Sequence, residues 1–475
     1  MNRLIVVASV CCLLTMALTG SAPAEERVST GDDQVDVAVT VYNSNLGLVR
    51  DLRKIELPGG TLELRFMDVA GAINPQTVHI DQAAGAGVLT VLEQNFEYDL
   101  INQQKLLEKY LGKKVVFLEI DENTKKTSRT EAVVLAAADD KMVFEIDGEI
   151  YFEHPGMLVL PELPENLISK PTLVWLLDND GAGTKTVEAS YLTREINWSA
   201  DYVALLDRKD TSLDLSGWVT IENRSGATYN NALLKLVAGE IHKVEPPVQR
   251  YEMMKAQTVG AARAPAFAEK PFFEYHLYTL DRRTTIKDNQ TKQMQLLTAD
   301  DVTVAKKYEY RGERHYFSGR MPRPVTDRKV GVYIEFRNDK NSGLGMPLPK
   351  GTFRVYKRDD DDSLQFLGED SIDHTPRDEE VKVKIGEAFD IVAERKQTDY
   401  QRIGDNAHQN AFEIKIRNHK DEDIVVEVVE PIPGDWQITE KSHEFEKTDA
   451  FTATFHIPVA KDGESVLTYR VLIRY

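Results

Sequence analysis

Alternation of apolar and polar side chains is the pattern that most constrains the fold of this 475-residue chain. It recurs at residues 35–41, 330–336, 412–416, 451–457 and 467–475. An apolar side chain at every second position gives a strand one buried face. The pattern therefore predicts a mainly β protein built from antiparallel β-sandwiches.

Turn-forming residues separate the predicted strands. Residues 58–60, 147–148 and 178–181 are rich in Pro, Gly, Asp and Asn, which accept the backbone angles of tight turns. One short helix is expected over residues 99–111, with Asp99 as its N-terminal cap and Gly112 after its end.

The length favours two to four domains, since domains usually run to roughly 100–200 residues. Proline-rich stretches at 154–171 and 246–271 suggest a rigid connector and a mobile loop. The predicted segments are an N-terminal β region ending in the helix (25–112), a small β-barrel-like module with its connector (113–171), a central β-sandwich (172–385) and a C-terminal β-sandwich (386–475).

The first 24 residues are typical of a secretory signal peptide. Arg3 precedes an apolar run over 4–18, and Ala22-Pro23-Ala24 provides the small residues of a cleavage site. An uncleaved membrane anchor is the alternative, although the run is shorter than the ~20 residues that a span needs. We expect cleavage after Ala24 and an exported protein, periplasmic or extracellular, without a transmembrane segment in the mature chain.

Both cysteines, Cys11 and Cys12, lie in this leader. The mature chain then has no disulfide, no thiolate metal site and no cysteine nucleophile.

Charge narrows the choice of partners. Asp and Glu total 77 against 58 Lys and Arg, a net charge of −19. Such a balance argues against binding to duplex nucleic acid or to an anionic membrane surface.

Catalytic and metal-binding motifs are missing from the sequence. There is no Gly-x-Ser-x-Gly, no His-Glu-x-x-His and no glycine-rich phosphate loop. The acidic run 359–362 lacks the spacing of a calcium loop and fits a solvated hairpin tip better. We expect no catalytic residue, no metal and no cofactor, although 77 carboxylates leave a hydrolase with paired acids open.

Two aromatic patches, 191–202 and 272–278, contain the candidate binding residues. Trp198 and Tyr202 share one side of a strand near Glu195, and Tyr275 lies in the second patch. Flat apolar rings beside carboxylates can bind sugars or peptides. The alternative is that Tyr191, Trp198 and Tyr202 fill a core.

The same stretches carry a family resemblance, together with 217–223, 236–240, 418–420, Pro433, Trp436 and 467–471. The chain resembles the secreted bacterial family called domain of unknown function 4139, and is distantly similar to the mucoidy inhibitor A family. It lacks the long coiled coil of the latter. The resemblance implies a β-rich, exported bacterial protein and supplies no reaction or ligand.

The expected function is that of an exported cell-envelope protein that is not an enzyme. It would bind an envelope protein or glycan, or act as a scaffold, through sandwich edges and loops. A hydrolase of envelope glycans or peptides that uses paired carboxylates is the alternative.

Overall fold

The computed structural model describes residues 25–97, 103–120, 126–138, 141–152, 154, 156–162, 170–239, 267–321 and 323–475. The predicted signal peptide and residues 246–266 of the predicted loop lie outside these ranges. The described part is mainly β, as expected, with one short α-helix, α1 (Gln103–Lys109). Short 3-10 turns lie at Gly31–Asp33, Pro75–Thr77, Arg314–Phe317 and Lys340–Ser342. Across the described ranges, no helix has the length and apolar character needed to cross a membrane.

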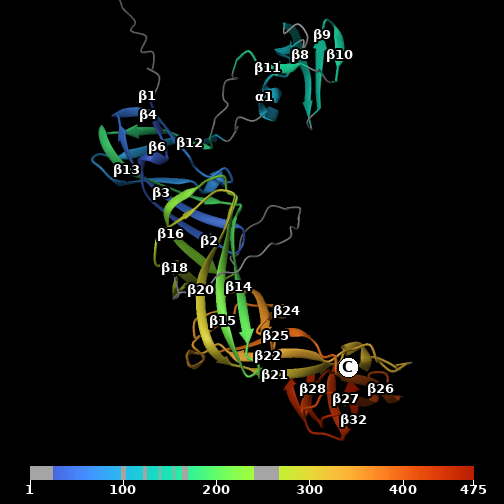
Figure 1. The fold of residues 1–475 in the computed structure, drawn as a ribbon. Coiled ribbons are helices and arrows are strands. Elements are labelled where there is room, and N and C mark those ends of the chain that lie inside the picture. Colours follow the sequence, from blue (N-terminus) through green and yellow to red (C-terminus); the bar gives the residue numbers. More distant parts are fainter. Residues whose placement is uncertain are drawn as a thin grey trace, which may run out of the picture. The chain divides into compact units, whose positions relative to one another are not determined.

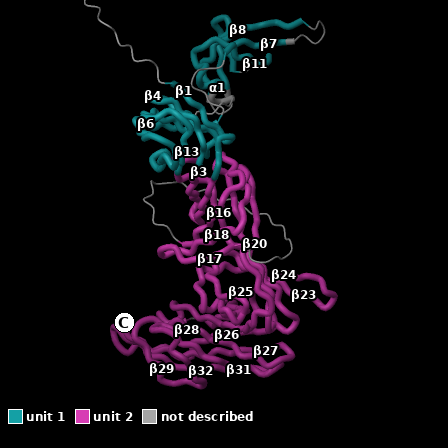
Figure 2. Tube along the Cα trace, turned by 90° about the vertical axis from the view of Figure 1, so that its left-hand side faces the viewer, with its two compact units in different colours: residues 1–36, 51–71, 75–190 teal, residues 37–50, 72–74, 191–475 magenta. Residues whose placement is uncertain are grey.

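Two compact units make up the chain (Figure 2). Unit 1 comprises residues 1–36, 51–71 and 75–190, and unit 2 comprises 37–50, 72–74 and 191–475. The strands β2 (Gln34–Tyr42), β3 (Leu46–Leu57) and β13 (Gly183–Thr193) contribute residues to both.

Unit 1 contains a four-stranded sheet. Its order is β1-β4-β12-β6. The strands are β1 (Glu25–Ser29), β4 (Gly60–Met67), β12 (Thr172–Asn179) and β6 (Leu89–Glu97). Phe66 and Trp175 pack edge to face beneath it, with ring centroids 5.6 Å apart.

The insertion between β6 and β12 forms a separate five-stranded sheet with the order β10-β9-β8-β7-β11. The strands are β7 (Lys114–Ile120), β8 (Thr127–Ala138), β9 (Lys141–Ile146), β10 (Glu149–Tyr151) and β11 (Met157–Val159). The expected barrel is corrected to an open sheet, because the edge strands β10 and β11 have three residues each and pair with β9 and β7 rather than with each other. β11 also lies inside the predicted connector.

The largest sheet has the order β17-β18-β16-β2-β3-β13-β5, and β19 pairs with β16. Its remaining strands are β5 (His79–Ala84), β16 (Tyr229–Ala238), β17 (Phe267–Phe272), β18 (Tyr275–Leu280) and β19 (Thr284–Ile286). The end of the predicted 246–271 loop is therefore strand, because β17 pairs along its whole length with β18.

A five-stranded sheet follows in unit 2, with the order β20-β15-β14-β23-β24 (Figure 1). Its strands are β14 (Ile196–Leu206), β15 (Ser212–Asn223), β20 (Gln290–Thr303), β23 (Gly351–Arg358) and β24 (Leu364–Ile372).

The C-terminal part of unit 2 is a β-sandwich. One sheet has the order β25-β22-β21-β28-β31-β30 and the other β26-β27-β32-β29. The strands are β21 (Ala305–Arg311), β22 (Gly331–Arg337), β25 (Glu380–Glu387), β26 (Ile391–Arg402), β27 (Ala407–Asn418), β28 (Ile424–Pro431), β29 (Asp435–Lys441), β30 (Phe445–Asp449), β31 (Thr452–Val459) and β32 (Glu464–Arg474). Phe455 and Tyr469, from opposite sheets, stack in the shared core with centroids 5.3 Å apart.

Four of these sheets are mixed, whereas the insertion sheet and the sheet β26-β27-β32-β29 are purely antiparallel. Parallel pairs join β1 to β4, β14 to β23, β16 to β2 and β21 to β28. Alternation predicts that a strand has a buried face but not which distant strand lies beside it, so the parallel pairing could not be read from the sequence.

Candidate functional site

Trp198 and Tyr202 lie on the inward face of β14 and are buried. The Trp198 indole Nε1 donates a hydrogen bond to the Val237 carbonyl at 3.1 Å, and its ring packs against Tyr278, 6.3 Å away. The two aromatic patches therefore meet inside the protein through Trp198 and Tyr278. Neither Trp198 nor Tyr202 presents its ring to solvent, as the core alternative anticipated.

Tyrosines from the two patches hold a loop in place. The Tyr202 hydroxyl donates to the Pro349 carbonyl at 2.7 Å, and the Tyr278 hydroxyl donates to the Pro347 carbonyl at 2.9 Å. Burial raises the pKa of both hydroxyls, so each remains a protonated donor.

The other two candidate residues lie elsewhere. Glu195 is exposed in the two-residue turn between β13 and β14, where its φ of 59° is left-handed. Tyr275 is half-buried at the start of β18, with its ring 6.2 Å from the exposed Phe273. The four residues do not form one surface site, and a binding role for them stays a prediction.

A pocket of about 320 Å³ in unit 2 offers a better-formed site. Its walls come from the five-stranded sheet, the six-stranded sheet and the segment 388–390 that connects β25 to β26. The aliphatic walls consist of Leu206, Val332, Ile334, Leu367 and Ile385. We call this the sheet-junction pocket.

Two β-bulges, in different sheets, supply walls of this pocket. Between β23 and β24 the pairing passes from Gly368 to Phe366 and leaves Leu367 as the extra residue. Between β22 and β25 it passes from Gly386 to Lys384 and leaves Ile385 as the extra residue. Bulges redirect side chains and are frequent beside functional sites. Here both extra residues line the same pocket.

The backbones of β24 and β25 come close beside the bulges. A Cβ atom on Gly368 would lie 1.9 Å from the Ile385 carbonyl oxygen. Only glycine fits that approach.

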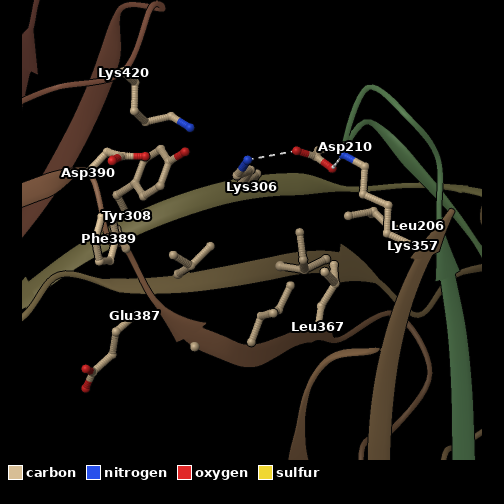
Figure 3. Close-up of a pocket in the computed structure, with 15 residues that line it drawn as sticks. Leu206, Asp210, Lys306, Tyr308, Lys357, Leu367, Glu387, Phe389, Asp390 and Lys420 are labelled. Atoms are coloured by element: carbon tan, nitrogen blue, oxygen red, sulfur yellow. Dashed lines mark hydrogen bonds and ion pairs between the residues drawn. The ribbon is translucent and has the colours of Figure 1, made fainter. Parts of the chain in front are cut away.

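Charged side chains also line the pocket, beside its aliphatic residues: Asp210, Lys306, Lys357 and Lys420 (Figure 3). The Asp210 carboxylate bridges the Lys306 ammonium at 2.7 Å and the Lys357 ammonium at 2.5 Å. Burial alone would raise the pKa of the Asp210 carboxyl, but hydrogen bonds from both lysines outweigh it and hold the pKa below its ordinary value. Burial likewise opposes protonation of Lys306, yet the bond to Asp210 raises its pKa. Lys306 is therefore charged at neutral pH and unsuited to act as a base or an amine nucleophile.

Phe389 is the unusual residue of this pocket. It lines the pocket, yet the residue is 94% exposed. No sequence motif singles it out, and the available signal was an aromatic residue between the acidic residues Glu387 and Asp390. No motif singles out Lys306, Lys357 and Lys420 either, because only the fold brings them together.

The resolved pKa shifts of the described carboxyl groups all have the same sign. Carboxyl groups with a clearly shifted pKa all shift downward: Asp68, Asp207, Asp210, Glu309, Asp339, Asp361, Asp399 and Asp449. A general acid at neutral pH needs the opposite shift. Within the same ranges, no group of three or more His, Cys, Asp or Glu side chains is placed to hold a metal ion.

Comparison with known proteins identifies a family for this chain. The family model described as Domain of unknown function (DUF4139) matches residues 187–475, which include every residue that lines the sheet-junction pocket. A search of curated proteins found no match. Neither comparison links the chain to the mucoidy inhibitor A family. Because the family model covers more than half of the chain, the protein belongs to the DUF4139 family.

Proposed function

We propose that this protein is a non-enzymatic binding protein of the cell envelope, which holds an apolar segment of another envelope protein in the sheet-junction pocket. The observation that carries the proposal is Phe389, an aromatic residue that is 94% exposed beside an aliphatic pocket. Exposed aromatic rings beside apolar hollows are typical anchors of protein interfaces.

The neighbouring edge strand supports a protein partner. β24 ends the order of its sheet, and it exposes Leu364 and Phe366, each at 55%. Together with Leu367 in the pocket, these residues offer apolar surface to an extended segment. An envelope glycan is the second candidate partner, but aliphatic walls suit an apolar side chain better than a polar sugar.

Export is the other half of the proposal. It rests on the charged start, apolar run and small-residue cleavage pattern of residues 1–24. The hydrolase alternative has less support, because the clearly shifted carboxyl pKa values favour the ionised form.

Site-specific photo-crosslinking in the native host tests the proposal. A benzophenone amino acid replaces Phe389 in one strain and Phe273 in the other, since Phe273 is a similarly exposed phenylalanine, at 85%. We expect a defined crosslinked protein from position 389 and none from position 273.

The variant Leu367→Asp tests whether the pocket itself is needed for the crosslink, because it places a charge in the pocket wall. Leu367 is already 38% exposed, so the protein should still fold. The crosslink at position 389 should disappear in that background. A crosslink that survives Leu367→Asp, or equal products from 273 and 389, would remove the pocket from the proposal.

A further inference from the structure

A second hollow in unit 2 has a different chemistry from the sheet-junction pocket and shares no lining residue with it. Its volume is about 560 Å³. Three cationic side chains line it, Arg337, Lys340 and Arg377, together with the carboxylates Asp339 and Asp378. We call it the cationic hollow.

A buried asparagine fixes the two chain segments that build this hollow. The Asn338 Nδ2 donates to the carbonyls of Met346 and Pro376, both at 2.9 Å, and its Oδ1 accepts from the Gly345 N–H at 3.2 Å. Asn338 is fully buried. The segment after β22 and the segment before β25 are thus joined through one side chain.

Backbone contacts strengthen this connection. Leu348 and Thr375 exchange two N–H···O bonds at 2.8 and 2.9 Å, and the Asp378 N–H donates to the Asn338 carbonyl at 2.8 Å. Gly345 has a φ of 89°, and a Cβ there would lie 3.0 Å from the backbone nitrogen of Lys340. The cations are therefore carried on a loop pair whose backbone is held before any ligand arrives, which lowers the ordering cost of binding.

The charges of the hollow are incompletely balanced. The Asp339 carboxylate accepts the Ser342 N–H at 2.9 Å and hydroxyl at 3.1 Å, and it lies 3.8 Å from the Arg337 guanidinium. No carboxylate of the residues that the structure describes lies within ion-pair distance of Lys340 or Arg377. In a chain of net charge −19, two unpaired cations beside a third form a locally positive site.

We infer that the cationic hollow binds an anionic sugar, with its phosphate or carboxylate group between Arg377 and Lys340. Guanidinium groups bind such oxyanions through two parallel N–H bonds, and lysine adds a point charge. The volume exceeds that of an inorganic ion and leaves room for a sugar ring. Asp339, Asp378 and Asn341 supply acceptors and an amide for ring hydroxyls. The inference does not depend on the proposed partner of the sheet-junction pocket.

Calorimetric titration of the mature protein tests this site with four probes: glucose 1-phosphate, glucuronate, inorganic phosphate and glucose. We expect the two charged sugars to bind, phosphate to bind more weakly and glucose not to bind. Affinity should fall as salt increases, because screening weakens exposed charge pairs. Glucose binding as tightly as the charged sugars, or no heat from either charged sugar, would overturn the inference.

A matched pair of double variants locates the binding. Lys340→Gln with Arg377→Gln removes the two unpaired cations, and Arg320→Gln with Lys461→Gln removes two exposed cations elsewhere in unit 2. The first pair should weaken charged-sugar binding by about tenfold or more, as loss of hydrogen bonds to a charged group predicts. The second pair should leave it unchanged, and equal losses in both would show a non-specific charge effect and refute the site.

The variant Arg377→Lys distinguishes the contribution of the planar guanidinium group to binding from that of the positive charge. It keeps the charge but loses the planar fork, so binding should be intermediate between the wild type and Arg377→Gln. Thermal melting confirms that each variant is folded, which is expected because all four cations are exposed.

Discussion

Arg395 and Glu430 form an ion pair whose side chains are both completely buried in the C-terminal sandwich. The rings of Tyr316 and Phe412 lie 5.0 and 5.4 Å from the Arg395 guanidinium carbon. Gly312 passes so close that a Cβ atom would lie 2.6 Å from a Glu430 carboxylate oxygen. Removal of either partner would destabilise the folded protein, because the remaining charge would be buried without water or a counter-ion.

Glu430→Gln should therefore lower the free energy of unfolding by about 3–5 kcal/mol, since Arg395 would remain buried without its counter-ion. The double variant Arg395→Met with Glu430→Leu should recover most of that loss. Chemical denaturation followed by tryptophan fluorescence, to which Trp436 of the same core contributes, measures both. A double variant that is no more stable than Glu430→Gln would contradict this account.

Asp207 organises the turn that carries Asp210. Its carboxylate accepts backbone N–H bonds from Ser212 at 3.0 Å, Thr211 at 2.6 Å and Lys209 at 3.1 Å. These bonds, that of Ser212 first, lower the carboxyl pKa from 3.8 to about 2 although burial opposes them. The folded state therefore holds this proton less tightly than the unfolded state. The stabilising contribution is complete above pH 3.8 and is lost as the pH falls to about 2.

Asp207→Asn should flatten the dependence of stability on pH in that interval, because the amide cannot be ionised. Denaturation curves at successive pH values measure the slope. Asp462→Asn is the control, an exposed turn aspartate whose side chain accepts no backbone N–H among the residues that the structure describes. If Asp462→Asn flattened the curve equally, the cause would be net charge rather than the Asp207 turn.

At the scale of elements, the sequence predicts strands well and their partners poorly. Alternation at 35–41 corresponds to β2, and Asp147-Gly148 forms the β9–β10 turn with positive φ at both residues. The parallel contact of β14 with β23, which sets Tyr202 beside Phe353, joins strands about 150 residues apart. A local sequence pattern does not indicate which distant strand lies beside it. A bulge such as the one at Leu367 interrupts the alternation in the same way as a loop, so the sequence does not distinguish the two. The sheet-junction pocket is built from both features, so it could not be predicted.

The two glycines beside the bulges provide a test of this element. Gly368→Ala should lower the unfolding free energy by about 1–3 kcal/mol, because the new methyl group meets a backbone oxygen that cannot rotate away. Gly386→Ala is the matched control in β25, where a Cβ meets nothing within 4 Å. Thermal unfolding compares them, and equal melting temperatures would show that β24 and β25 are not in close contact.

At the scale of the whole molecule, the insertion sheet β7–β11 has a much smaller core than the C-terminal sandwich. Tyr110, Val115, Phe117, Phe144 and Ile146 are its main buried apolar residues. Ile150, Phe152 and Met157 remain 63–73% exposed on its outer strands and the residue that follows β10. A core of this size stabilises a module weakly, since small modules bury a smaller share of their surface.

We therefore expect thermal unfolding in two steps, with the insertion melting first and unit 2 later. A protein in which residues 113–160 are replaced by a short Gly-Ser linker should lose only the first step. It should also keep the position-389 crosslink and the binding of charged sugars, because every residue that lines either hollow belongs to unit 2. Differential scanning calorimetry separates the steps. Loss of the second transition in the shortened protein would mean that the insertion is required for unit 2 to fold, and would make the two binding sites properties of the whole chain.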